Sequence, residues 1–184
     1  MNQHESDALV LFGATGDLAY RKIYPALQAM IRSGRLDVPV IGVARSGWTL
    51  ESLRELVRES LREHGDGGDG GDGDGGAATE RLAGLLRYVD GDYGDAATYA
   101  RLRLALGDAK HPLHYLAVPP SLFASVVDGL GRSGSADGAR VVVEKPFGRD
   151  LASSQQLNRA VHRVFPEESI FRIDHYLGKE TVQN

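Results

Sequence analysis

The sequence predicts an α/β domain with a doubly wound, mostly parallel sheet and helices on both faces of that sheet. Short apolar runs such as residues 8–12 and 141–143 are typical of strands that are buried on both faces. These runs alternate with amphipathic segments long enough for helices, which is the pattern of a parallel sheet with crossover helices. Glycine-rich or charged residues follow several runs, at the edge where such sheets bind ligands. We assign residues 1–184 to one such domain, since this length suffices for a single core.

The first predicted strand, residues 8–12, leads into a Gly-x-x-Gly-x-x-Ala turn and then into a helical repeat of apolar residues that stops at Gly34. Such a turn also occurs for backbone geometry alone. This order of elements nevertheless favours dinucleotide binding, because glycines let the backbone approach the pyrophosphate and the helix start offers free N–H groups. Pro25 predicts a kink or a restart inside the helix. The turn residues predicted to bind the cofactor are Gly13, Ala14, Thr15, Gly16, Asp17 and Leu18.

Arg45 and Ser46 close the second predicted strand, residues 38–44. The residue at this position distinguishes the two nicotinamide cofactors. A carboxylate accepts a hydrogen bond from the ribose 2′-hydroxyl of NAD, whereas an arginine accommodates the 2′-phosphate of NADP. An arginine at a strand end can also be an ordinary surface residue. Together with the Thr15 hydroxyl in the facing turn, Arg45 and Ser46 favour NADP over NAD.

Residues 65–76 consist of glycine and aspartate alone. Calcium-binding repeats of similar composition need a recurring apolar position to build a stacked sheet, and this tract has none. We therefore expect a flexible and dispensable surface loop. It follows an amphipathic helix that begins after Thr49, which is a suitable N-cap residue.

The rest of the chain continues the alternation of helices and strands. Pro119 and Pro120 are expected to stop one strand, and Asp150 to cap the last helix. The predicted helices are 78–86, 95–106, 121–130 and 151–164, and the predicted strands are 87–90, 113–118, 141–143 and 170–173.

A cluster of polar side chains follows the last predicted strand, residues 170–173. Lys145 follows the strand at 141–143 in the same way. Arginine outnumbers lysine 17 to 4 in this chain, so a lysine at these places suggests a contact that needs a compact ammonium. The cluster suits a phosphate or another anion, although a solvated, charged helix start is the other interpretation. Its members are Asp174, His175, Tyr176 and Lys179.

Composition excludes several other classes of function. The net charge is −4, and four of the 25 acidic residues lie in the Gly/Asp tract, so the remaining charges balance at 21 each. No overall field therefore favours nucleic acid or a membrane surface as a partner. The absence of cysteine excludes disulfides, thiolate zinc sites and a cysteine nucleophile, and we expect no metal. The polar first residues lack a signal-peptide pattern, so we expect a cytoplasmic protein.

Three blocks of the sequence resemble glucose-6-phosphate dehydrogenase. The resemblance extends from about residue 9 to residue 184, and the Gly/Asp tract is its visible departure. It implies a Rossmann-like NADP-binding domain of that family. The blocks are Gly-Ala-Thr-Gly-Asp-Leu-Ala at 13–19 with Lys-Ile-Tyr-Pro at 22–25, Glu-Lys-Pro-Phe-Gly-Arg-Asp-Leu at 144–151, and Arg-Ile-Asp-His-Tyr-Leu-Gly-Lys-Glu at 172–180.

The resemblance also implies roles for matching residues. Residues 13–19 would form the cofactor turn, with Thr15 and Arg45 near the 2′-phosphate, and Tyr115 would line the cofactor site. Lys145 would contact both cofactor and sugar and is, with Asp174, one of the two expected catalytic residues. Pro146 would set the backbone at Lys145, and the sugar phosphate would be held by His175, Tyr176 and Lys179.

The reaction that the resemblance implies is oxidation of the C1 hydroxyl of glucose 6-phosphate to a lactone, with hydride transfer to NADP, in the oxidative pentose phosphate pathway. Asp174 would orient the catalytic histidine, which in this family belongs to a second, sheet-rich domain that we expect beyond Asn184. Residues 1–184 alone are therefore expected to be inactive, and His175 is not expected to be the base. Members of the family are expected to be homo-oligomers, and this shorter chain is expected to be a monomer.

Two alternatives stay open at this point. One is another NADP-dependent sugar oxidoreductase, because the Glu-Lys-Pro motif after a strand is shared more widely. The other is a non-catalytic NADP-binding module, which would bind the cofactor without turnover.

Overall fold

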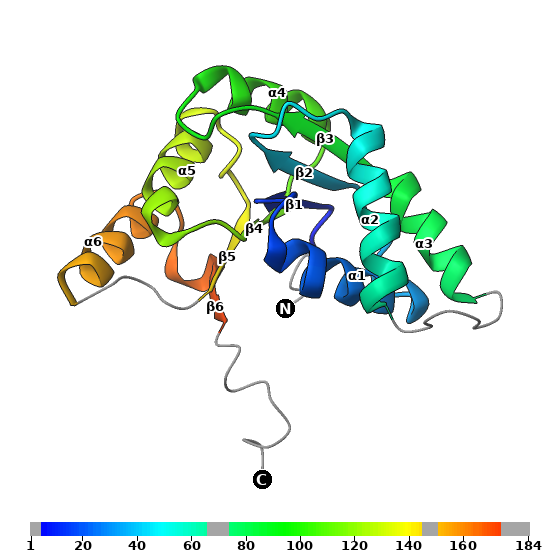
Figure 1. Cartoon of the computed structure of the whole chain (residues 1–184). Coiled ribbons are helices and arrows are strands. Elements are labelled where there is room, and N and C mark those ends of the chain that lie inside the picture. The colour runs from blue at the N-terminus through cyan, green and yellow to red at the C-terminus, as the bar shows by residue number, and fades with distance from the viewer. Residues whose placement is uncertain (1–4, 66–73, 145–150, 174–184) are drawn as a thin grey trace, which may run out of the picture.

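Six parallel strands form one sheet in the order β3-β2-β1-β4-β5-β6 (Figure 1). The structure is a computed structural model that describes residues 5–65, 74–144 and 151–173. Each pair of neighbouring strands runs parallel, which confirms the predicted α/β class with a doubly wound sheet. The strands are β1 (Ala8–Phe12), β2 (Val40–Ala44), β3 (Leu86–Asp90), β4 (Pro112–Leu116), β5 (Arg140–Glu144) and β6 (Ile170–Ile173).

The strand register brings the carboxyl ends of the strands to the same edge of the sheet. Phe12 at the end of β1 is paired with Val43 of β2 on one side and with Leu116 of β4 on the other. From β1 the chain first winds toward β2 and β3, and it then returns to the opposite side of β1 as β4. The direction of winding therefore reverses between β1 and β4, and sheets of this kind bind nucleotides in the crevice at such a point.

Helices cover both faces of the sheet, as predicted (Figure 1). Along β1, Leu9 and Leu11 belong to the core shared with α1, α2 and α3, whereas Val10 and Phe12 belong to the core shared with α4, α5 and α6. Within the part of the chain that the structure describes, no helix has the length and apolar character needed to cross a membrane. The helices are α1 (Tyr24–Arg32), α2 (Leu50–His64), α3 (Asp74–Leu85), α4 (Ala96–Leu106), α5 (Pro120–Arg132) and α6 (Leu151–His162).

The helix after the glycine turn starts as one π-helical turn, η1 (Ala19–Ile23), and restarts as α1. The N–H of Tyr24 bonds to the carbonyl of Ala19, five residues earlier, and Pro25 has no N–H with which to continue that pattern. The predicted restart at Pro25 is thus confirmed. The Tyr24 side chain is fully buried, and its hydroxyl donates to the Ala14 carbonyl at 2.6 Å. This bond ties the helix to the turn that precedes it.

Part of the Gly/Asp tract is helical, so the prediction of a loop over 65–76 was wrong at its end. α3 begins at Asp74, four residues before the expected start. The carbonyl of Gly75 accepts hydrogen bonds from the Thr79 hydroxyl at 2.9 Å and from the Gln28 amide at 3.2 Å. Gln28 is a buried residue of α1, so tertiary contacts hold a glycine-rich turn that helix propensity disfavours. Residues 66–73 of the tract lie outside the described residues.

The other predicted elements are present with small changes at their ends. β4 starts at Pro112 and stops at Leu116, two residues before the predicted end, although the N–H of Ala117 still bonds to the Phe12 carbonyl at 3.0 Å. The cap predicted at Thr49 is confirmed, because its side chain accepts the Ser52 N–H at 3.2 Å. β2 starts two residues later than predicted, α5 starts one residue earlier and ends two later, and α6 ends two residues earlier.

His114 is a buried titratable group at the centre of the sheet. Its ring packs against Phe12 and Phe165, and its Nε2 hydrogen-bonds the Ser135 carbonyl at 2.7 Å. That bond requires the neutral ring to carry its proton on Nε2, and among the described residues the buried Nδ1 has no hydrogen-bond partner. Burial lowers the pKa of His114 to about 4, because the charged ring would lose its hydration.

Folding should therefore become sensitive to acid through His114. The unfolded chain, with a histidine pKa of about 6.5, binds more protons than the folded chain below that pH. The contribution of His114 to the free energy of unfolding is fully present above about pH 6.5. It should fall by about 3 kcal/mol as the pH drops to about 4. Urea unfolding at pH 7, 5.5 and 4.5 measures it. His114→Leu should be less stable at pH 7 but show a flatter pH dependence, and parallel curves for the two proteins would refute the role of His114.

Candidate functional site

The glycine turn lies directly after β1, where the chain approaches the end of β4. Gly13 has a φ of +82°, and a Cβ at this position would overlap the Ala117 carbonyl. Both the backbone angle and the close approach therefore require glycine here. The N–H of Gly16 donates to the Gly13 carbonyl at 3.0 Å, which closes the turn. The geometry of the predicted cofactor turn thus depends on the contact between β1 and β4.

The same turn presents unused hydrogen-bond donors. In the described part of the chain, no protein acceptor receives the backbone N–H of Thr15, Asp17 or Leu18. These groups precede or begin the helix at Ala19, where the first N–H groups lack partners within the helix and carry partial positive charge. Free N–H groups on a closely approaching backbone suit a pyrophosphate, so the turn fits a dinucleotide.

A cavity of about 240 Å³ lies at the reversal point between β1 and β4. Leu18 borders it from the turn, and Glu144 borders it from the end of β5. The end of β4, the residues that follow it and the start of α5 form the remaining wall. This is the crevice in which the topology places a nucleotide. The lining residues are Leu18, Leu116, Ala117, Val118, Pro119, Pro120, Phe123 and Glu144.

The predicted 2′-phosphate residues lie together at the end of β2. The hydroxyls of Thr15 and Ser46 are hydrogen-bonded at 2.8 Å, so the turn and the end of β2 face each other as the sequence predicted. The guanidinium of Arg45 is 75% exposed and lies 2.7 Å from the Asp92 carboxylate. The exposed guanidinium and the paired hydroxyls present donors that suit a phosphate group.

The connection between β3 and α4 positions this region, and sequence reasoning missed it. Asp90 accepts the backbone N–H groups of Ser46 at 3.0 Å and Gly47 at 2.8 Å. The Ser46 N–H makes the largest contribution to a lowered pKa of Asp90, so this carboxylate stays charged at neutral pH. The available signal was the run Asp-Gly-Asp-Tyr-Gly-Asp at 90–95, a polar cluster after a predicted strand like those that were selected.

Tyr93, in the same connection, reaches the cofactor turn itself. Its hydroxyl accepts the Gly13 N–H at 3.0 Å and donates to the Val43 carbonyl at 3.2 Å. The Tyr93 carbonyl accepts the Tyr99 hydroxyl of α4 at 2.8 Å and the Ser125 hydroxyl of α5 at 3.1 Å. Burial raises the pKa of Tyr93, which keeps the phenol protonated. Tyr93 therefore joins two helices to the first residue of the glycine turn.

Tyr115 of β4 was predicted to line the cofactor site. Its side chain is half-buried, and its hydroxyl donates to the Glu144 carboxylate across the ends of β4 and β5. Burial and this hydrogen bond both raise the pKa of Tyr115. Because Glu144 borders the cavity, the Tyr115–Glu144 pair lies beside the nucleotide crevice, and contact of Tyr115 with a cofactor stays a prediction.

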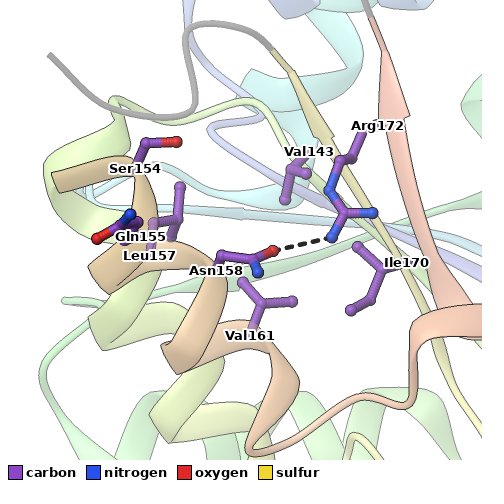
Figure 2. Close-up of a pocket in the computed structure, with 8 residues that line it drawn as sticks. All are labelled: Val143, Ser154, Gln155, Leu157, Asn158, Val161, Ile170 and Arg172. Atoms are coloured by element: carbon purple, nitrogen blue, oxygen red, sulfur yellow. Dashed lines mark hydrogen bonds between the residues drawn. The ribbon is translucent and has the colours of Figure 1, made fainter. Parts of the chain in front are cut away.

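The predicted sugar site follows the ends of β5 and β6. The last residues of these strands, Glu144 and Ile173, are partners in the parallel register. Arg172 of β6 bonds to Glu167 through both terminal nitrogens, at 2.8 and 3.2 Å, and to Asn158 of α6 at 3.0 Å. Figure 2 shows the Asn158 contact beside a cavity of about 200 Å³. Arg172 thus anchors the end of β6 to α6. The predicted residues Lys145, Asp174, His175, Tyr176 and Lys179 lie outside the described residues.

A comparison with protein-family models identifies this architecture. Residues 10–184 match the model described as "Glucose-6-phosphate dehydrogenase, NAD binding domain". The chain belongs to the glucose-6-phosphate dehydrogenase family. The resemblance inferred from the three sequence blocks is thereby confirmed.

Individual relatives in the glucose-6-phosphate dehydrogenase family agree with this assignment. Glucose-6-phosphate 1-dehydrogenase 1 of Mycobacterium tuberculosis is 43% identical over 177 residues, which cover 96% of this chain and 36% of the relative. The enzyme of Mycolicibacterium smegmatis is 44% identical over 183 residues and is likewise covered to 36%. The chain therefore spans about a third of the length of these relatives.

Solved structures of glucose-6-phosphate dehydrogenases have the same fold as this chain. The crystal structure of the Mycobacterium avium enzyme has a TM-score of 0.87 and 43% identity, over 98% of this chain and 38% of that one. A glucose-6-phosphate dehydrogenase in complex with glucose 6-phosphate has a TM-score of 0.83 and 34% identity, over 100% of this chain and 40% of that one. The sheet, the glycine turn and the end of β2 thus belong to a fold that the family shares.

The contact between Tyr93 and Gly13 should matter for binding a dinucleotide. In Tyr93→Phe the ring remains but the Gly13 N–H loses one of its two acceptors, so the turn should be held less firmly. We expect about threefold to tenfold weaker binding of NADP, the equivalent of one ordinary hydrogen bond, measured by titration calorimetry. Tyr20→Phe is the control, because the Tyr20 hydroxyl bonds to Glu63 and not to the turn. Equal affinities of wild type and Tyr93→Phe would contradict the positioning role.

Proposed function

We propose that this chain binds NADP and serves in the oxidation of glucose 6-phosphate at C1. The observation that carries the proposal is the arrangement at the end of β2. Arg45 is exposed there, and the hydroxyls of Thr15 and Ser46 are hydrogen-bonded to each other. Both features lie beside the backbone N–H groups of the turn that no acceptor in the described residues receives. The pyrophosphate and the 2′-phosphate of NADP would then bind to different groups of the protein, and these groups lie next to each other. The nicotinamide, when bound, supplies the hydride acceptor.

The turn and the end of β2 would divide the work of holding NADP. The N–H groups of residues 15, 17 and 18 would bind the pyrophosphate, because no acceptor in the described part of the chain receives them and they lie at a helix start. Arg45 would bind the 2′-phosphate through charge-assisted hydrogen bonds, for which a planar guanidinium is suited. The nicotinamide half would extend toward the crevice between β1 and β4, since topology places the nucleotide there.

The residues after β5 and β6 would hold the sugar next to the cofactor. Lys145 follows Glu144, which borders the crevice, and it would contact both the nicotinamide end of NADP and the reacting C1 hydroxyl. Asp174 follows Ile173, the register partner of Glu144, and would orient the catalytic histidine. Transfer of a hydride needs the sugar carbon held close to the nicotinamide, so these contacts serve positioning. The sugar phosphate would be gripped by His175, Tyr176 and Lys179.

Arg45→Ala tests the cofactor half of the proposal. Loss of a charge-assisted contact should weaken NADP binding about tenfold to a hundredfold, while NAD, which has no 2′-phosphate, should bind within about twofold of its original affinity. Calorimetric titration of each variant with each cofactor measures this.

Arg81→Ala is the matched control for Arg45→Ala. Arg81 is also an exposed arginine paired with an aspartate, Asp37, but this pair lies before the start of β2 at the opposite edge of the sheet. Removal of the Arg81 side chain should leave the affinities for NADP and for NAD unchanged. Equal losses of NADP and NAD in Arg45→Ala would show that Arg45 supports the fold and does not select the cofactor.

Lys179→Ala tests the sugar half. Removing an ammonium from the phosphate grip should weaken binding of glucose 6-phosphate at least about tenfold and leave NADP affinity within about twofold. Equilibrium binding of the sugar to the NADP-saturated protein is the measurement. Lys110→Ala is the control, because Lys110 precedes β4 at the other edge of the sheet. An unchanged affinity for glucose 6-phosphate in Lys179→Ala would exclude Lys179 from the site.

A further inference from the structure

Asp92 is hydrogen-bonded to the guanidinium of Arg45, the group that the proposed function assigns to the 2′-phosphate. Its Oδ2 lies 2.7 Å from Nη1 of Arg45, which is the distance of a charge-assisted hydrogen bond. Among the described residues, Asp92 is the one polar partner of the Arg45 side chain. A phosphate that binds Arg45 must therefore share the guanidinium with a carboxylate or displace that carboxylate.

The position of Asp92 does not depend on Arg45. Its Oδ1 accepts the Gly94 N–H at 2.7 Å, and its carbonyl accepts the Thr98 hydroxyl at 2.8 Å. The carboxylate is thus held by an N–H group of its own loop, and the backbone of Asp92 is held by the start of α4. The Arg45 side chain is the more exposed of the two, at 75% against 52% for Asp92. Displacement would accordingly move the arginine and leave the aspartate in place.

The sheet register keeps the two residues side by side. Ala44 at the end of β2 is paired with Asp90 at the end of β3, so Arg45 and Asp92 leave adjacent strands at the same edge. Asp90 is already used by the N–H groups of Ser46 and Gly47. Asp92 is the carboxylate of this connection that faces Arg45.

Asp92 keeps its charge at neutral pH. The Gly94 N–H and, after it, Arg45 lower the pKa of this carboxyl group. A phosphate brought to Arg45 would consequently meet a fixed negative charge as well as the guanidinium. The ribose 2′-hydroxyl of NAD is neutral and meets no such repulsion.

We propose that Asp92 is a specificity-determining residue that competes with the 2′-phosphate of NADP for Arg45 and so narrows the preference for NADP over NAD. This inference rests on the proposed NADP site. When no NADP is bound, the Asp92 carboxylate occupies the place at Arg45 that the 2′-phosphate would take. It assigns cofactor preference to the β3–α4 connection in addition to the end of β2.

Asp92→Asn is the decisive variant, because asparagine keeps an oxygen for the Gly94 N–H and removes the charge. NADP should bind about threefold to fivefold more tightly, as expected for release of an exposed ion pair, and NAD should bind unchanged or more weakly. Calorimetric dissociation constants for both cofactors give the ratio directly, without any need for turnover. Asp37→Asn, which removes the partner of Arg81 at the far edge, should leave both constants unchanged.

A double-mutant cycle shows whether Asp92 acts through Arg45. In the Arg45→Ala background, Asp92→Asn should strengthen NADP binding less than it does when Arg45 is present, since only the repulsion between Asp92 and the phosphate is then relieved. An equal gain in both backgrounds, an unchanged NADP-to-NAD ratio, or weaker NADP binding in Asp92→Asn would overturn the inference. Failure of the proposed function would look different, because the wild-type chain would then bind neither cofactor.

Discussion

One carbonyl oxygen, that of Val43 in β2, organises the nucleotide end of this domain. It accepts the N–H groups of Gly13 and Ala14 at 2.9 and 3.3 Å and the Tyr93 hydroxyl at 3.2 Å. These donors come from the turn after β1 and from the connection after β3, on either side of β2. Because all three donors reach one oxygen, the turn after β1 and the connection after β3 must converge at the end of β2. The cofactor turn is therefore defined by tertiary hydrogen bonds in addition to its glycines.

The two sides of the crevice are built on different principles. On the β2 side, backbone N–H groups and exposed charges are held by carboxylates, as when Asp90 accepts from Ser46 and Gly47. On the β4 side the wall is mostly apolar, with Pro119, Pro120 and Phe123 among its residues and Glu144 at its edge. A dinucleotide has the same asymmetry, with phosphates at one place and flat rings at another. The site thus matches the cofactor by the chemistry of its walls as well as by topology.

Much of this site followed from local sequence signals. The buried strands, the glycine turn, the cap at Thr49 and the restart at Pro25 depend on residues close together in the chain, and each was predicted. The contacts of Asp92 and Tyr93 depend on how β1, β2 and β3 are aligned, which no local pattern encodes. The glycine-rich start of α3 was misjudged for the same reason, because Gln28 holds it from another helix. Residues 145 and 174–179 follow strands that were correctly predicted, and their roles stay predictions.

The π-helical turn at Ala19–Ile23 has a consequence for insertions and deletions. A π turn contains one residue more than an α turn, and each residue of an α-helix advances the chain by about 100°. A π turn takes up its extra residue within about one full turn, so the residues after it keep nearly the phase that they would have in an unbroken α-helix with one residue fewer. Tyr24 therefore reaches the Ala14 carbonyl from the buried face although this segment carries the additional residue. The wide turn thus lets the segment between the nucleotide turn and its supporting helix differ by one residue in length without turning Tyr24 away from that face.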